Sequence, residues 1–181
     1  MSVMGAENIP KSNDGYIMVS NHTHYSDIPI LAGIFKNSIG FLAKKELSEK
    51  ALLKFWMDTT GIIRIDRERP RASTIKLVKE CLETKGWKVG IFIEGTRSRI
   101  KGKLGKPNNG AAYIAKLTKK PILPIGINYG EDKKVTINIG KPYNLDYEKE
   151  LEDSSWQCLE KISKLSGLSL PEKNVPEKVT I

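Results

Sequence analysis

The sequence predicts an α/β fold, a single-domain sandwich in which helices flank a largely parallel central sheet. Short apolar stretches rich in β-forming residues alternate along the chain with longer stretches at helical spacing, which is the pattern of strands and helices around a parallel sheet. Residues 88–93 form a nearly continuous apolar run, typical of a central parallel strand. Residues 73–85 place their apolar side chains on one face of a helix. The chain has 181 residues, enough for one proper core, so we expect residues 1–181 to form a single domain.

The first third of the chain is expected to begin with a polar lead-in and then alternate strands with helices. We predict a lead-in at residues 1–15, strands at 16–19 and 39–43, helices at 27–35 and 47–58, and a turn, a short strand and polar residues within 61–67. Asp27 occupies the N-cap position of the first helix, and Pro29 falls in its first turn, where a missing N–H does little harm. Residues 47–58 are broadly apolar and include Trp56, so this helix belongs either to the core or to a membrane interface.

The rest of the chain continues the alternation. We predict helices at residues 73–85, 110–119 and 147–165, strands at 88–93 and 121–128, and a strand nearer an edge at 135–139. Asn108 or Asn109 caps the helix that starts at residue 110. The tail, residues 167–181, contains Pro171 and Pro176 and is expected to be irregular.

The net charge of +9 is concentrated in one segment. Between Gly95 and Gly130 there is no acidic residue, and the basic residues are Arg97, Arg99, Lys101, Lys103, Lys106, Lys116, Lys119 and Lys120. Such a basic segment suits an anionic partner, which is a phosphorylated substrate, an acidic carrier protein, an anionic bilayer or a nucleic acid. The alternative is a charged face that is only solvated.

Cysteine usage and hydropathy restrict the compartment. Cys81 and Cys158 are far apart and form no CxxC pattern, which favours a reducing compartment. We expect no signal peptide, since no charged and then apolar leader opens the chain. The longest apolar run, residues 28–35, is well short of the roughly 18–20 residues that a spanning helix needs. We therefore expect any membrane contact to be peripheral, at the cytoplasmic face.

His22 and Asp27 are the first candidate pair for chemistry. They lie in and just after the turn that follows the strand at residues 16–19, and ligands of open α/β sheets bind at such carboxyl ends of strands. A carboxylate bonded to an imidazole fixes its tautomer and stabilises its cation, which leaves the other ring nitrogen free as a base. Two other interpretations remain open. In the first, Asp27 is only a helix cap and His22 is a turn residue. In the second, His22, His24 and Asp27 are ligands of a metal.

Further charged residues follow the ends of other predicted strands. Arg67 follows a short strand, Lys44 follows another, and residues 94–98 follow the central strand. If these strands are parallel, the charged groups converge with His22 on one edge of the sheet. Two Arg and a Lys can hold one phosphate monoester, because guanidinium groups bind phosphate oxygens in a bidentate manner. Each residue alone is more simply a solvated charge or one half of an ion pair, such as Arg97 with Glu94.

Taken together, four sequence blocks resemble those of the glycerolipid acyltransferase family, whose bacterial 1-acylglycerol-3-phosphate acyltransferases are the most similar. The blocks are Asn21-His22-x4-Asp27, Gly61-x3-Ile65-Asp66-Arg67, Glu94-Gly95-Thr96-Arg97-Ser98 and Pro121-Ile-Leu-Pro124-Ile-Gly126. They occur in the family's order, and the similarity extends from about Gly5 to Tyr143. The chain departs from the family pattern at His24, where Ser is usual, and at Ile93, where Pro is common.

The resemblance implies a glycerol-3-phosphate acyltransferase-like fold and an enzyme of phospholipid biosynthesis. It implies transfer of a fatty acyl group from acyl-CoA or acyl carrier protein to 1-acylglycerol 3-phosphate, giving phosphatidic acid, with no cofactor and no metal. His22 would be the general base and Asp27 would orient it. The residues expected to bind the acceptor or organise its site are Lys44, Arg67, Glu94, Gly95, Thr96 and Arg97. The implied partners are a lysophosphatidic acid or related glycerophosphate and an anionic membrane surface.

Two alternatives remain. The acceptor is glycerol 3-phosphate or another lysolipid, in which case the chemistry is unchanged. In a different class, the basic segment belongs to an anion-binding or nucleic-acid-binding protein. Nucleic acid is not expected, because Tyr113 is nearly the only aromatic residue interleaved with the basic ones.

Overall fold

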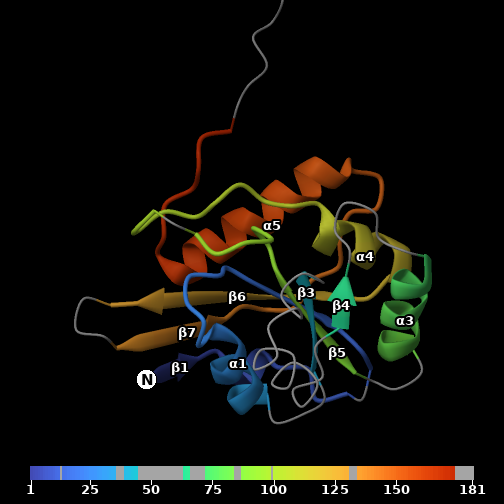
Figure 1. The fold of residues 1–181 in the computed structure, drawn as a ribbon, viewed down its shortest axis with the longest axis horizontal. Helices are drawn as coiled ribbons and strands as arrows, with labels where there is room; N and C mark the ends of the chain where they lie inside the picture. Colours follow the sequence, from blue (N-terminus) through green and yellow to red (C-terminus); the bar gives the residue numbers. More distant parts are fainter. Residues whose placement is uncertain are drawn as a thin grey trace, which may run out of the picture.

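In a computed structural model, the chain forms an α/β sandwich (Figure 1), described for residues 1–12, 14–35, 39–44, 63–65, 72–83, 87–98, 100–130 and 134–173. Within these ranges, seven strands form one sheet in the order β1 (Ser2–Met4), β7 (Val135–Ile139), β6 (Ile122–Tyr129), β2 (Ile17–Ser20), β5 (Lys88–Phe92), β3 (Ile39–Lys44) and β4 (Ile63–Ile65). Only the β6–β7 pair is antiparallel among them. The predicted fold class and the largely parallel sheet are therefore confirmed.

Helices cover both faces of the sheet. The α-helices of the described ranges are α1 (Asp27–Phe35), α3 (Ala72–Glu83), α4 (Gly110–Thr118) and α5 (Leu151–Ser166), and a 3-10 helix, η1, spans Ala6–Asn8. In Figure 1, α3, α4 and α5 lie on one side of the sheet and α1 lies on the other. None of these helices combines the length and the apolar character that crossing a bilayer requires.

Strand β2 lies in the middle of the sheet and separates two cores. Ile17 and Val19 point into the cluster beneath α3, α4 and α5, whereas Tyr16 and Met18 point into the cluster beneath α1. This division follows from the alternation of side chains along a strand. β2 is paired in parallel with β5 and β6, so that Ser20 lies opposite both Phe92 and Ile125. The carboxyl ends of β2, β5 and β6 therefore meet at one edge of the sheet.

The ends of the chain differ in detail from the sequence-based expectation. The lead-in contains β1, which pairs in parallel with β7, so β7 lies one strand inside the edge. A strand of three residues is too short to show an alternating pattern of apolar side chains. The position of β1 depends on its backbone pairing with β7. The last helix begins at Leu151 instead of residue 147, since Glu150 has an extended backbone and serves as the N-cap. Of the tail, Ser169 bridges to Lys103, and residues beyond 173 lie outside the described ranges.

Some predictions fall on parts of the chain that the structure does not describe. The helix expected at residues 47–58 lies entirely outside the described ranges, as do Asp66 and Arg67. The other predicted strands and helices are confirmed within a few residues at each end.

Candidate active site

The turn after β2 and the turn after β5 are joined through His22. Its backbone N–H donates to Glu94 Oε2 over 2.9 Å, and its carbonyl accepts from the Ser98 N–H over 2.7 Å. The two loops that carry the first and third sequence blocks are therefore held together at the sheet edge, as the parallel-strand argument predicted.

The His22 ring is bonded to Asp27. His22 Nδ1 lies 2.7 Å from Asp27 Oδ2, and the Asp27 side chain is fully buried. The same oxygen accepts the backbone N–H groups of Thr23 and His24, at 2.8 and 2.9 Å. Asp27 is thus the first residue of α1, one position inside the helix from the predicted N-cap, and its carboxylate binds the turn before the helix and the imidazole. In the described part of the chain, the cap bond that the sequence suggested is replaced by these contacts.

The environment of Asp27 keeps it ionised. Burial would raise the pKa of this carboxyl, but hydrogen bonds from His22, from the Tyr129 hydroxyl and from the amides of His24 and Thr23 together lower it below its usual value. An ionised Asp27 favours a proton on the Nδ1 atom of His22 and stabilises the imidazolium. The Nε2 atom is then the ring nitrogen that can accept a proton.

The orientation of the His22 ring is also restricted by Phe92, the last residue of β5. The two rings stack with centroids 3.9 Å apart and planes inclined by 14°, and the His22 side chain is 16% exposed. The ring is held on one side by the carboxylate and on one face by the phenyl group, while part of it stays open to solvent. This is a suitable setting for proton transfer with a bound molecule.

Glu94 binds backbone groups on both sides of the site. Oε2 accepts the His22 N–H, and Oε1 accepts the Gly105 N–H over 2.8 Å. Burial raises the pKa of Glu94, an effect that these two amides only partly offset. Gly95 follows with φ of 70°, a left-handed conformation that glycine adopts without strain. This turn directs Thr96 and Arg97 away from the strand.

Arg97 lies against the loop that carries His22. Its guanidinium carbon is 3.6 Å from the centroid of the Tyr25 ring, a cation–π contact, and Tyr25 is 71% exposed. Between the described residues Arg97 and Glu94 the structure records no ion pair. The Glu94 carboxylate accepts hydrogen bonds from backbone amides instead. The positive charge of Arg97 therefore remains available to an anion next to His22.

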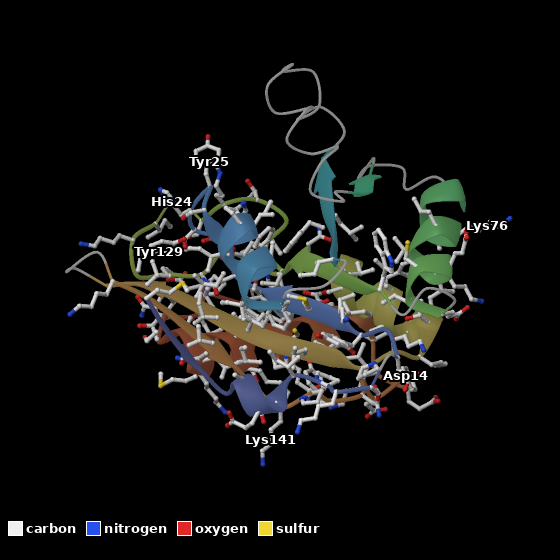
Figure 2. The ribbon with its side chains drawn as sticks, turned by 90° about the horizontal axis from the view of Figure 1, so that it is seen from below. Asp14, His24, Tyr25, Lys76, Tyr129 and Lys141 are labelled. Atoms are coloured by element: carbon white, nitrogen blue, oxygen red, sulfur yellow. The ribbon has the colours of Figure 1, made fainter. Side chains whose placement is uncertain are left out.

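Tyr129 was not selected as a site residue from the sequence, although it contacts Asp27. The Tyr129 hydroxyl donates to Asp27 Oδ1 over 2.6 Å and lies 2.9 Å from Ser26 Oγ. Figure 2 shows Tyr129, His24 and Tyr25 gathered at the same edge of the sheet. A signal was available, since Tyr129 ends the apolar run of residues 121–128 and β6 is a neighbour of β2. It could not be used without knowing the strand order.

Asn21 is a second contributor that was not selected. Its fully buried side chain donates to the Ile127 carbonyl and accepts from the Ile127 N–H, both over 2.8 Å. These two bonds extend the β2–β6 pairing by side-chain contacts after β2 has ended. They fix the start of the His22 turn relative to Tyr129.

His24 has a different environment from His22. Its ring is exposed, and Nδ1 lies 2.7 Å from Ser26 Oγ. Over the described ranges, no group of three or more His, Cys, Asp or Glu side chains is arranged to hold a metal. The absence of a cofactor stays a prediction.

A cleft of about 260 Å³ opens beside this hydrogen-bond network. Its lining includes Thr23 and Tyr129 from the site and Lys101 and Lys103 from the basic segment. The cleft therefore has a polar wall at the turn after β2 and cationic side chains at its other side.

The sequence profile of the family described as Acyltransferase matches residues 1–128. The chain belongs to this family. Its curated relatives include 1-acyl-sn-glycerol-3-phosphate acyltransferases of Brassica napus, a chloroplastic protein, and of Streptococcus pneumoniae. The first is 35% identical over 125 residues, which are 68% of this chain and 36% of the relative. The second is 31% identical over 159 residues, which are 81% of this chain and 57% of the relative. The chain thus spans only about a third to three fifths of these two relatives.

A solved structure of the family has the same fold. The crystal structure of the 1-acyl-sn-glycerophosphate (LPA) acyltransferase PlsC from Thermotoga maritima superposes with a TM-score of 0.70 at 27% identity. The match covers 90% of this chain and 69% of the other. The resemblance inferred from the four blocks is therefore confirmed as membership of the family.

The structure describes some of the candidate site residues fully and others only in part or not at all. His22, Asp27, Glu94, Gly95, Thr96 and Arg97 lie together at the sheet edge. Lys44 ends β3 at the same edge, and only its backbone is described. Arg67 follows β4 outside the described ranges. The roles of all these residues are taken up as proposals.

Proposed function

We propose that the chain transfers a fatty acyl group from an acyl thioester to the free hydroxyl of 1-acylglycerol 3-phosphate, which gives phosphatidic acid. The His22–Asp27 pair at 2.7 Å is the observation that carries this proposal. Family membership supports the reaction class, and the names of the relatives support the acceptor. The donor is acyl-CoA or acyl carrier protein.

His22 is the general base in this reaction. Its Nε2 atom takes the proton of the acceptor hydroxyl while that oxygen attacks the thioester carbonyl, and the ionised Asp27 stabilises the resulting imidazolium. Collapse of the tetrahedral intermediate breaks the C–S bond, and the proton on His22 passes to the departing thiolate. A positioned base contributes roughly 10²–10⁴-fold to the rate. Holding both substrates in line at the sheet edge supplies much of the rest.

The acceptor phosphate binds to the cations beside His22. Arg97 is the described member of this group. The family resemblance adds Lys44 and Arg67, whose side chains lie outside what the structure describes. Glu94 acts through the backbone, because it holds the His22 amide and the Gly105 amide in one arrangement. Gly95 and Thr96 form the turn that brings Arg97 to the acceptor.

The enzyme works at a membrane surface. The acceptor is a lipid, and the basic segment of residues 97–120 matches the negative charge of an anionic leaflet and of either donor. The cytoplasmic face is the location that fits an acyl-CoA or carrier-protein donor.

The decisive experiment measures thiol release from a long-chain acyl-CoA and from acyl carrier protein. Each donor is combined with lysophosphatidic acid, with glycerol 3-phosphate or with no acceptor, in the presence of lipid vesicles. We expect release that requires lysophosphatidic acid. The variant His22→Ala should lose at least about 10³-fold in kcat with an unchanged melting temperature, since it removes the base. His24→Ala should stay within about tenfold of wild type, because a hydrogen bond contributes far less than a base.

The alternatives have separate outcomes. Release only with glycerol 3-phosphate would keep the mechanism and change the acceptor. More than a few per cent of the activity in folded His22→Ala would eliminate His22 as the base. No release under any condition from folded protein would contradict the proposed function and favour an anion-binding protein.

A further inference from the structure

The two oxygens of the Asp27 carboxylate have different partners. Oδ2 binds the His22 ring and the amides of Thr23 and His24, whereas Oδ1 accepts the Tyr129 hydroxyl at 2.6 Å. A carboxylate bonded through one oxygen only can rotate about its Cβ–Cγ bond. The bond to Oδ1 comes from a different strand and opposes that rotation.

The protons of this network have a defined direction. Burial, and then the bond to Asp27, raise the pKa of Tyr129 above its ordinary value, so the hydroxyl keeps its proton. That proton lies on the bond to Asp27 Oδ1, because a carboxylate only accepts. Ser26 Oγ, 2.9 Å from the Tyr129 oxygen, can therefore only donate to it. His24 Nδ1 lies 2.7 Å from the same Ser26 Oγ and accepts the Ser26 backbone N–H over 3.2 Å, so the loop holds Ser26 through both groups.

Tyr129 is itself held in place by the sheet. β6 pairs with β2 in register, and Asn21 binds both backbone groups of Ile127, two residues before Tyr129. The neighbouring Asn128 side chain donates to the Ser166 carbonyl at the end of α5 over 2.7 Å. The hydroxyl is therefore presented from a rigid strand, which is a suitable support for an active-site group.

We propose that Tyr129 is a positioning residue of the active site, which holds the Asp27 carboxylate in the plane that aligns His22 and which is itself oriented by the Ser26 hydroxyl. This inference rests on the proposed function for its kinetic consequences, but its geometric content is independent of the substrate. Tyr129 contacts Asp27 and not the reacting atoms, so it acts through His22.

The kinetic test compares Tyr129→Phe with wild type in the thiol-release assay. We expect kcat to fall about tenfold, the scale of one hydrogen bond to a charged group, while the KM of both substrates stays within about twofold. The matched control is Tyr16→Phe, which removes a buried hydroxyl that has no hydrogen-bond partner in the described structure and lies at the opposite end of β2. This control should leave kcat unchanged. An unchanged kcat in Tyr129→Phe, or an equal loss in both variants, would overturn the proposal.

A double-mutant cycle separates positioning from a general loss of packing. Ser26→Ala should lower kcat about threefold in wild type and have no effect in Tyr129→Phe, because the two residues act in one chain of hydrogen bonds. If the two substitutions lower kcat by independent factors, so that the double variant shows their product, the chain of hydrogen bonds from Ser26 through Tyr129 to Asp27 would be contradicted.

A crystal structure of Tyr129→Phe gives a readout that needs no activity. We expect the Asp27 carboxylate to rotate or to occupy two positions, with loss of the single His22–Asp27 geometry. If wild type transfers no acyl group, the proposed function fails while this experiment still decides the inference. An unmoved carboxylate in the variant would refute it.

Discussion

At the scale of single residues, the two carboxylates of the site have different partners and different roles. Asp27 is an ionised group that accepts four hydrogen bonds, and it holds the imidazole by charge and direction. Glu94 is an acidic residue whose partners are backbone amides, and it holds the loop. The family resemblance implied that Asp27 orients His22 and that Glu94 organises the acceptor site, but it did not indicate that the partners of Glu94 are backbone amides.

Arg97 provides the test at this scale. Replacing it with Ala should raise the acceptor KM about 10- to 100-fold with little change in kcat, because a charge-assisted bond to the phosphate is lost in the bound and transition states alike. The acceptor KM of Arg97→Lys should lie between those of wild type and Arg97→Ala, since Lys keeps the charge without the planar group that stacks on Tyr25. Steady-state kinetics with lysophosphatidic acid measure the effect.

Lys116→Ala is the matched control for charge, since Lys116 is an exposed member of the basic segment on α4. An acceptor KM that is unchanged in Arg97→Ala, or that rises equally in Lys116→Ala, would remove Arg97 from the phosphate site.

At the scale of elements, helix α5 and strand β6 form the support beneath Tyr129. Asn128 of β6 and Asn138 of β7 donate to the carbonyls of Ser166 and Leu165, which are among the groups that a helix leaves unpaired at its end. The close approach requires Gly126, because a Cβ atom there would lie 2.3 Å from the Ser166 nitrogen. The end of the helix and the strand are therefore in backbone contact.

Gly126→Ala should destabilise the fold by about 1–3 kcal/mol, because the added methyl group overpacks this contact and displaces α5. Thermal unfolding followed by circular dichroism measures the loss. The matched control is Gly33→Ala on an exposed position of α1, where a Cβ atom would meet nothing within 4 Å. This change should stabilise the fold by about 0.5–1 kcal/mol through helix propensity. Equal melting temperatures of the two variants would contradict the packing argument.

How much the sequence could predict depended on the distance along the chain between partners. His22 and Asp27 are five residues apart, so their pairing was visible as a motif. Tyr129 and Asp27 are 102 residues apart, and their contact depends on β6 lying beside β2, which no local pattern specifies. Strand β1 was missed for the same reason, since its pairing with β7 comes from register and not from hydrophobic alternation.

At the scale of the whole molecule, some basic and exposed apolar side chains gather at the cleft and the loop beside it. Lys101 and Lys103 line it together with Ile100, which is 65% exposed, and Tyr25 is exposed beside Arg97. Lys141 lies on another side of the molecule, away from His24 and Tyr129 (Figure 2). This distribution fits a protein that approaches an anionic surface with its active site first.

Vesicle sedimentation tests this orientation. Wild type should bind vesicles rich in anionic phospholipid, bind neutral phosphatidylcholine vesicles weakly, and dissociate as salt screens the attraction over a length of about 10 Å at 0.1 M. Reversing two charges in Lys101→Glu/Lys103→Glu should weaken binding at least about tenfold, at roughly 1 kcal/mol for each basic residue. Lys141→Glu is the control for a single reversal elsewhere and should bind as wild type does. Because the double variant reverses two charges and Lys141→Glu reverses one, a loss of binding free energy in Lys141→Glu about half that of the double variant would indicate attraction by net charge without orientation.

The central place of β2 has a consequence for how the protein is made. On the ribosome, this strand and the histidine after it emerge before their partners, since the amide of His22 is bonded to a residue 72 positions later and Asn21 to one 106 positions later. Until β5 and β6 have left the exit tunnel, the nascent chain presents an apolar strand with both edges open, a form that chaperones recognise and that associates readily with other chains. The histidine is therefore synthesised well before the residues that hold it, and it reaches its working position only after they have been added.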